Sequence, residues 1–157
     1  MRKWPIYTLL LAAALLVPTR TTELGKLKPV ETVAVYPEGD QLVIETDTGD
    51  LGRGRNVEEA IGNLKQTTAG TIYLDTADFL IIAEGAEPFV KYLSSHLKSS
   101  VRICLGEKGL DLAEAGAYLA VHRPSVKLKD YRERTLLDQL KAYQGRLELQ
   151  KNKWRNL

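Results

Sequence analysis

The stretch that decides the fold runs from Asn56 to Leu105 and begins with Asn56-Val57-Glu58-Glu59-Ala60-Ile61-Gly62-Asn63-Leu64. Asn is favoured directly before a helix, where its side-chain oxygen accepts a hydrogen bond from a backbone N–H of the first turn. Glu59 follows three positions later, which is the spacing of a capping box. The sequence therefore predicts a helix that begins directly after Asn56.

The remainder of this stretch alternates between strand and helix signals. Residues 71–74 lead into the apolar run 79–83, which has the length and composition of a buried strand. Residues 86–97 place their apolar side chains on one face of a predicted helix, and residues 101–105 are predicted to return to a strand. This alternation predicts a sheet that is covered by helices.

Segments on either side extend the predicted sheet and add a helix. Residues 31–36 and 41–46 carry β-branched residues in alternation around the turn-forming Pro37-Glu38-Gly39-Asp40, which predicts an antiparallel hairpin. Residues 110–121 are rich in Ala and Leu and are predicted to form a further helix. We therefore expect one α+β domain over residues 30–125, with a single mixed β-sheet of four or five strands and packed helices.

The N-terminus has the pattern of a targeting segment, and residues 1–19 are predicted to be a signal peptide or membrane anchor. Arg2 and Lys3 precede the uncharged apolar run Ile6 to Val17, whose length suits a signal-peptide core better than a full membrane span. Both cleavage and retention stay open, with a preference for retention because no small-residue cleavage site follows the run. The charges then place the body outside the cytoplasm, with residues 20–29 as a linker.

Composition and charge restrict the class of protein. A chain of 157 residues, 44% of them hydrophobic, can bury the core of one globular domain. Its net charge of +2 hides an uneven distribution. Residues 30–125 carry 15 acidic and 8 basic side chains, whereas residues 126–157 carry 4 acidic and 9 basic ones. Because an acidic body repels phosphate backbones, we expect no nucleic-acid partner.

Cysteine and histidine are too few for an intramolecular disulfide or a dedicated zinc site. Cys104 is the only cysteine, and its neighbours Ile103 and Leu105 predict a buried, unreactive thiol in a strand. His96 and His122 are the only histidines. We therefore expect neither a metal nor a cofactor.

Residues 126–157 are predicted to form a basic, amphipathic, helical tail. Four apolar residues recur there at helical spacings of four, three and four: Leu136, Leu140, Tyr143 and Leu147. This face either packs on the domain's own sheet or docks on a partner or an anionic membrane surface. Trp154 lies among basic residues and favours an interface at the end of the tail. These five residues are the candidate interaction residues.

Two other places could carry chemistry. Asp75 and Asp78 form a carboxylate pair at the entry to a strand, where aspartates more often make turn hydrogen bonds than act as acid and base. The loop Gly49 to Arg55 contains three glycines before a helix, an arrangement that can cradle a phosphate. Its spacing matches neither the P-loop nor the dinucleotide-binding pattern, and a plain flexible loop is the preferred interpretation.

The order of elements and several motifs resemble one known family. The motifs that carry the likeness are Glu23-Leu24, Pro29 to Val35, Glu59-Ala60-Ile61-Gly62-Asn63-Leu64, Ile72-Tyr73-Leu74, Phe79 to Gly85 and Val101 to Leu105. Within residues 20–115 they are similar to the N-terminal domain of the C subunits of spore germinant receptors. These subunits are the Ger(x)C lipoproteins of endospore-forming bacteria.

Three departures limit what this resemblance implies. The lipidated Cys of the family is absent, and Pro18 stands near its place. Asp75-Thr76 stands where the family has a Gly-His pair, and residues 116–157 show no likeness to the family's larger C-terminal part. The resemblance thus implies a freestanding first domain that acts as a non-enzymatic receptor component.

Together these features predict a membrane-tethered, extracytoplasmic, non-enzymatic interaction module that resembles part of a spore germination or sporulation receptor complex. Its expected partners are the membrane, through the N-terminal segment, and other subunits of such a complex. The alternative expectation is a small exported enzyme or phosphate-ligand-binding protein that uses Asp75 and Asp78 or the Gly49–Arg55 loop.

Overall fold

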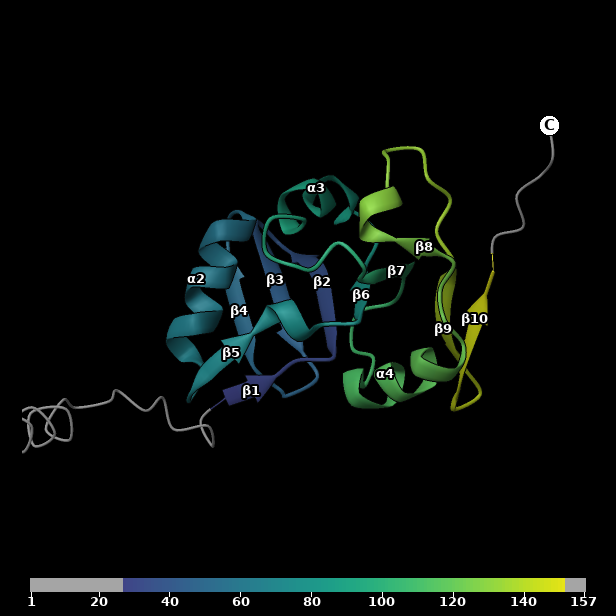
Figure 1. Ribbon diagram of the computed structural model, residues 1–157, viewed down its shortest axis with the longest axis horizontal. Helices are drawn as coiled ribbons and strands as arrows, with labels where there is room; N and C mark the ends of the chain where they lie inside the picture. Colours follow the sequence, from purple (N-terminus) through teal and green to yellow (C-terminus); the bar gives the residue numbers. More distant parts are fainter. Residues whose placement is uncertain (1–26, 152–157) are drawn as a thin grey trace, which may run out of the picture.

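The computed structural model describes residues 27–151, which form a mixed eight-stranded sheet with helices packed against it (Figure 1). The sheet order is β10-β9-β7-β6-β2-β3-β4, and β8 pairs with β7 beside this path. The strands are β2 (Thr32–Glu38), β3 (Gln41–Thr46), β4 (Leu51–Gly54), β6 (Phe79–Ile82), β7 (Arg102–Leu105), β8 (Val126–Lys127), β9 (Gln139–Tyr143) and β10 (Arg146–Gln150). The α+β class is confirmed, but the expected number of four or five strands is too low.

The other elements of residues 27–151 are three helices, three short 3₁₀ turns and a small second sheet. The helices are α2 (Val57–Thr67), α3 (Val90–Leu93) and α4 (Leu112–Val121), and the 3₁₀ turns are η2 (Leu74–Thr76), η3 (Glu87–Phe89) and η4 (Leu128–Asp130). The second sheet is a parallel pair made by β1 (Leu27–Pro29) and β5 (Thr71–Tyr73). Residues 27–29, which were predicted to belong to a linker, are therefore part of the folded domain.

Strand β2 lies at the centre of the sheet, and the predicted hairpin supplies its first partner. It pairs antiparallel with β3, with Val35 opposite Ile44, and parallel with β6. The hairpin closes between Glu38 and Gln41, where Gly39 has a φ of +60°, a conformation that glycine adopts without steric cost. Alternate residues of β2 enter two different cores, because successive side chains of a strand point to opposite faces.

Each face of the sheet has its own apolar core. The larger core lies under α2 and α3 and includes Val33 and Val35 of β2. The smaller core lies under α4 and includes Ala34 of β2, Leu119 of α4 and Leu140 of β9. The sheet is therefore covered on both faces.

Helix α2 begins as the capping signal predicts. The backbone N–H of Glu59 donates to Oδ1 of Asn56 at 2.8 Å, and the Glu59 carboxylate accepts from the backbone N–H of Arg55 at 2.9 Å. The helix then packs closely on β4. A Cβ at Gly52 would lie 2.2 Å from the Ala60 carbonyl oxygen, and one at Gly54 would lie 2.4 Å from the Ala60 nitrogen. Only glycine permits this approach of helix and strand.

The helix predicted over residues 86–97 is much shorter than expected. Pro88 lies in the first turn of η3, and α3 then ends at Leu93. The next two residues explain this end, because the hydroxyl of Ser94 donates to the Lys91 carbonyl and that of Ser95 to the Tyr92 carbonyl. Serine hydroxyls that bond local carbonyls in this way compete with continued helix.

The predicted C-terminal helix is wrong over the described part of the tail. Residues 139–150 form the antiparallel hairpin β9–β10, closed by the two-residue turn Gln144-Gly145. Both turn residues have positive φ, +47° and +74°, as a type I′ turn requires. Leu140 pairs across the hairpin with Leu149, so the relevant apolar period is two and not 3.6.

The four residues of the predicted helical face consequently do not share a surface. Leu140 is fully buried and Leu147 packs against the smaller core, whereas Leu136 is 54% exposed and Tyr143 is 60% exposed. Trp154 and the predicted signal or anchor segment, residues 1–19, lie outside the described residues. Within residues 27–151, no helix is long and apolar enough to cross a membrane.

A substitution at Gly54 tests the close contact of α2 with β4. Gly54→Ala should destabilise the protein by about 1–3 kcal/mol, because the new methyl group collides with helix backbone that cannot move freely. Gly62→Ala is the matched control. Gly62 lies inside α2 with nothing within 4 Å of an added Cβ, so Ala should stabilise by roughly 0.5–1 kcal/mol. Urea unfolding measures both, and equal effects would contradict the packing.

Two leucines distinguish the observed hairpin from the predicted helix. Leu140→Ala removes a fully buried side chain and should cost about 2–5 kcal/mol of unfolding free energy. Leu136→Ala changes an exposed side chain and should cost roughly 0.5 kcal/mol or less. Denaturant unfolding of the two variants checks this, and similar losses would favour a shared helical face.

Candidate functional site

The two candidate carboxylates lie at the amino end of β6 and do not form a catalytic pair in a pocket. Both Asp75 and Asp78 are exposed. Asp78 forms an ion pair with Lys98, whose Nζ lies 2.6 Å from Oδ1 of Asp78. Asp75 lies in the 3₁₀ turn η2. Thr76 has the more definite structural role, because its hydroxyl accepts from the Val30 backbone N–H and donates to the Val30 carbonyl, each at 2.9 Å. The bonds of Thr76 join η2 to the chain at Val30, and Asp75 and Asp78 do not form an acid–base pair here.

The Gly49–Arg55 segment is also not a phosphate cradle. Residues 51–54 of this segment form β4, and the space beside Gly52 and Gly54 is filled by the backbone of α2. Arg53 donates its backbone N–H to Asn63 Oδ1 at 2.9 Å, and its guanidinium pairs with Glu38 at 3.2 Å. Gly52 and Gly54 therefore serve helix packing, whereas Gly49, with a φ of +79°, lies in the turn before β4. The flexible-loop interpretation is wrong for residues 51–54, which form a strand.

A hollow of about 570 Å³ lies at the carboxyl ends of the parallel strands β2, β6 and β7. Such edges are where open sheets of this kind usually bind ligands. We call this hollow the strand-end hollow; it is lined by Tyr36, Pro37, Ala83, Glu84, Glu87, Leu105, Gly106, Glu107, Lys108 and Gln139. Its lining includes three glutamates and one lysine, so acidic side chains outnumber basic ones there.

The lysine of the strand-end hollow is paired with a carboxylate outside the hollow's lining. Lys108 forms an ion pair with Glu38, and this contact, followed by that of Arg53, lowers the pKa of the Glu38 carboxyl. The ammonium of Lys108 also lies 5.2 Å from the centre of the Tyr36 ring. Burial, followed by the hydrogen bond that Tyr36 donates to Glu45, raises the pKa of the Tyr36 hydroxyl to about 12. Tyr36 is thus a neutral wall residue.

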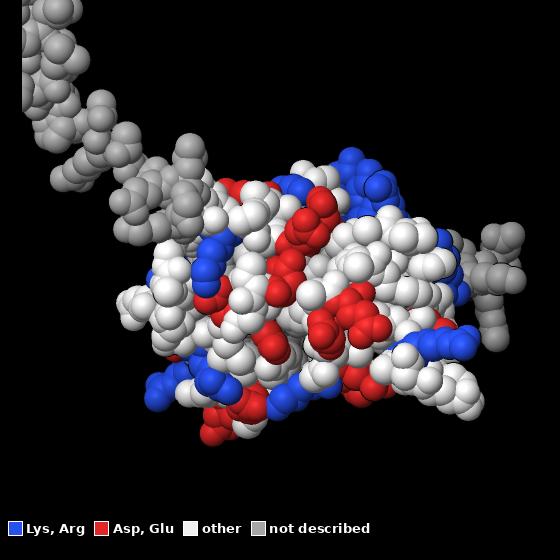
Figure 2. All heavy atoms as spheres, turned by 90° about the horizontal axis from the view of Figure 1, so that it is seen from below, with Lys and Arg blue, Asp and Glu red and all other residues white. Residues whose placement is uncertain are grey.

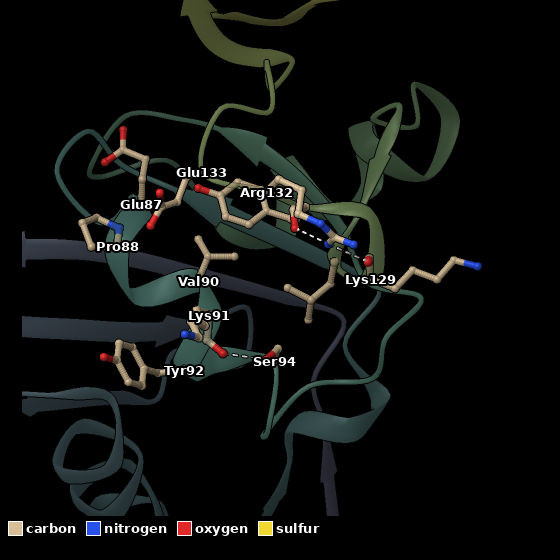
Figure 3. A pocket seen from close by; sticks show the side chains of 11 residues that line it. Glu87, Pro88, Val90, Lys91, Tyr92, Ser94, Lys129, Arg132 and Glu133 are labelled. Atoms are coloured by element: carbon tan, nitrogen blue, oxygen red, sulfur yellow. Dashed lines mark hydrogen bonds between the residues drawn. The ribbon is translucent and has the colours of Figure 1, made fainter.

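A second hollow of about 690 Å³ opens between η3–α3 and the segment that contains η4 (Figure 3). We call it the α3–η4 groove; it is lined by Glu87, Pro88, Val90, Lys91, Tyr92, Ser94, Leu128, Lys129, Tyr131, Arg132 and Glu133. Figure 3 shows Val90 between Tyr92 on one side and Arg132 with Glu133 on the other. Glu87 lines both hollows, so the two adjoin.

The floor of the α3–η4 groove is held by the main core. Val90 and Leu128 are buried members of that core, and Tyr131 packs against it while remaining half-buried. Burial, followed by the charges of Glu87 and Glu133, raises the pKa of the Tyr131 hydroxyl. The groove therefore has a rigid apolar floor and a neutral phenol beside two carboxylates.

The rim of the groove is charged with both signs. Two hydrogen bonds hold Arg132 in place. Its Nη1 donates to the Tyr131 carbonyl at 2.8 Å, and its backbone N–H donates to Thr135 Oγ1 at 2.8 Å. Lys91 and Lys129 add two further cations, and Glu87 and Glu133 add anions. Tyr92 is 55% exposed on α3. Sequence reasoning missed this groove because its two walls lie more than 30 positions apart in the chain.

The single thiol is not part of either hollow. Burial, followed by the nearby Asp138 charge, raises the pKa of Cys104 to about 12, so the prediction of a buried thiol is confirmed. Asp138 itself is 1% exposed, and its Oδ2 accepts from the backbone N–H and the hydroxyl of Ser125 at 2.7 and 2.9 Å. This buried carboxylate joins the start of β9 to the chain before β8.

Figure 2 shows the end of the molecule away from α3, where acidic side chains lie across the middle of the face. The amino ends of β2 and β6 place Glu31, Asp47 and Asp78 side by side there. The backbone N–H of Glu31 donates to the Asp47 carboxylate, and the N–H of Asp78 donates to the Glu31 carbonyl. Basic side chains lie around the margins of this face (Figure 2). A hollow of about 330 Å³ beside Glu31 and Asp78 is also lined by Arg102, Arg123 and Lys127, so charges of both signs meet there.

Comparison with family models, with curated proteins and with solved structures finds no match for this chain.

Proposed function

We propose that this protein is a non-enzymatic binding module, held at the outer face of a membrane, whose α3–η4 groove receives a segment of a partner protein. The observation that carries the proposal is the groove itself, with its buried apolar floor and its rim of mixed charge. Grooves of this construction provide apolar contact at the centre and polar contact at the edge, as protein interfaces do.

The residue types in the groove support protein recognition. Tyrosine and arginine are enriched among the residues that carry most of the binding energy at interfaces, and the groove presents Tyr92, Tyr131 and Arg132 together. Arg132 is already oriented by backbone carbonyls, so a partner would not have to order it. Pre-organised side chains of this kind lower the entropic cost of binding.

The alternative function, a small exported enzyme or a phosphate-ligand binder, has weaker support. Asp78 is engaged by Lys98, and the glycines of the Gly49–Arg55 segment contact helix backbone. Neither feature faces the α3–η4 groove or the strand-end hollow. Binding by the groove is therefore the better-supported function.

The location and context of the module rest on the sequence. The apolar segment behind Arg2 and Lys3 supports attachment to a membrane with the body outside the cytoplasm. The resemblance of residues 20–115 to the first domain of Ger(x)C proteins supports a place in a spore germination or sporulation complex. In such a complex, the partner of the groove is another membrane-associated subunit.

Topology is tested with a reporter fused after Leu157. Alkaline phosphatase, which is active only when exported, should be active in this position because residues 1–19 direct the body across the membrane. The control is a fluorescent protein that folds only in the cytoplasm, which should stay dark at the same junction. An inactive phosphatase with a bright cytoplasmic reporter would contradict export.

Groove binding is tested by photo-cross-linking in intact cells. A photoreactive phenylalanine analogue at Tyr92 should cross-link the full chain to one discrete partner, because this side chain stands at the open side of the groove. The same analogue at Tyr73, an exposed tyrosine on β5 that does not line the groove, should not produce that product.

A charge reversal in the rim completes this test. Arg132→Glu should abolish the Tyr92 cross-link, since it replaces an oriented cation by a third carboxylate beside Glu87 and Glu133. Arg55→Glu, an exposed site outside the groove, should leave it intact. Equal products at Tyr92 and Tyr73, or no effect of Arg132→Glu, would count against the groove as the binding site.

A further inference from the structure

The strand-end hollow has an excess of acidic side chains that residues 27–151 do not neutralise. Glu84 and Glu107 are exposed in its lining, and Glu87 is half-buried there. None of these three glutamates takes part in the ion pairs formed within the described chain. Lys108, the cation of the lining, is paired with Glu38 outside it. A basic occupant would therefore find unpaired carboxylates in this hollow.

The wall of the hollow also offers apolar surface. Ala83 and Leu105 are only partly buried there, and Pro37 is exposed. The volume of about 570 Å³ lies in the range of ordinary ligand pockets, so the hollow can admit a large side chain. The occupant that suits this surface carries a bulky apolar group beside cations.

The chain itself contains a segment of this composition. It is the sequence Lys151-Asn152-Lys153-Trp154-Arg155-Asn156-Leu157, which has three cations and no acidic side chain. Trp154 lies between two of the cations. Tryptophan provides a large apolar surface that is costly to leave in water, and neither the proposed groove nor the folded core gives this side chain a partner.

The described chain leads this segment to the hollow. Gln150, the last residue of β10, lies directly opposite Gln139, and Gln139 lines the hollow. Residues that face each other in an antiparallel pair have Cα atoms about 4.5–5.5 Å apart. Trp154 follows Gln150 by four positions, and four extended residues span about 13 Å. The segment thus begins beside the hollow and is long enough to enter it.

We propose that the segment 151–157 docks in the strand-end hollow of its own chain. Trp154 packs on the apolar wall, and the cations on either side of it face glutamates of the lining. Because the segment is tethered at the rim, its effective concentration there is on the order of millimolar, so a weak contact is enough to hold it. The docked segment closes the sheet edge at which open sheets usually bind ligands.

Charge favours this hollow over the adjoining α3–η4 groove. The groove lining has three cations of its own, Lys91, Lys129 and Arg132, against two glutamates. A segment with three cations would meet like charges there, and such contacts suppress binding. The strand-end hollow has three glutamates and a lysine that is already paired. The inference does not depend on the partner proposed for the groove.

Cross-linking within the full chain tests this docking. A photoreactive phenylalanine analogue at Trp154 should attach to residues 83–84 or 105–108, as read by mass spectrometry of the digested product. The same analogue at Tyr143, which is exposed and does not line the hollow, is the control and should not give these products. A mixture of isotopically labelled and unlabelled chains shows whether both ends of the cross-link belong to one molecule.

A charge exchange provides the second measurement. Glu84→Lys combined with Glu107→Lys should lower the yield of the cross-link roughly threefold or more, because attractive contacts become repulsive ones. Lys153→Glu combined with Arg155→Glu should have the same effect, and all four changes together should restore the yield. Glu58→Lys, at an exposed site on α2 outside the hollow, is the control and should leave the yield unchanged.

Each outcome decides the proposal. A cross-link within one molecule to the hollow lining, lost in both double variants and regained in the fourfold one, supports it. Attachment to residues 88–94 or 128–133 would place the segment in the α3–η4 groove. A cross-link between labelled and unlabelled chains would place it on a second copy, and attachment to lipid alone would place it on the membrane. Any of these three results, no cross-link, or a yield that ignores the charge exchange would overturn the proposal.

Discussion

Burial of β2 on both faces is the constraint on which the rest of the structure depends. Residues 32–36 are buried without interruption, and alternate side chains enter the larger core under α2 and α3 or the smaller core under α4. Each face of β2 is covered by its own core, so the strand is fully buried only when both cores are complete. On the α4 side this contact is so close that a Cβ at Gly116 would lie 2.3 Å from the Thr32 hydroxyl. The glycine inside α4 therefore sets the distance between helix and sheet and does not merely weaken the helix.

The helices do more than cover the sheet, because their side chains also bond the outer backbone of its edge strands. Asn63 and Thr67 place polar side chains on the outer backbone of β4, whereas α4 reaches only Leu149 of β10 through Tyr118. Exposed strand edges are usually blunted by charge, short length or covering elements. In this domain α2 bonds the outer backbone of β4, and α4 bonds that of β10 at Leu149.

The two largest hollows lie toward one end of the molecule. The carboxyl ends of the parallel strands and α3 carry the strand-end hollow and the α3–η4 groove, while the amino ends carry the face shown in Figure 2, with its mixed charges (Figures 1 and 2). The groove unites residues 87–94 with residues 128–133, two segments joined by β7, α4 and β8. A groove made in this way is positioned by the sheet beneath it, as is usual for loops on a folded scaffold.

Local signals in the sequence determined the elements whose physics is local. The cap formed by Asn56 and Glu59, the hairpin around Gly39 and the buried strand at residues 79–82 all follow from interactions among neighbours in the chain. The leucine spacing in the tail was ambiguous, because the positions that fit a helix also flank the Gln144-Gly145 turn, and only pairing of β9 with β7 and packing on α4 selected the hairpin. Tertiary structure alone decided that Gly52 and Gly54 admit a helix and not a phosphate, and that Val90 and Leu128 share the floor of one groove. These outcomes depend on contacts between distant segments, whose distances no local pattern encodes.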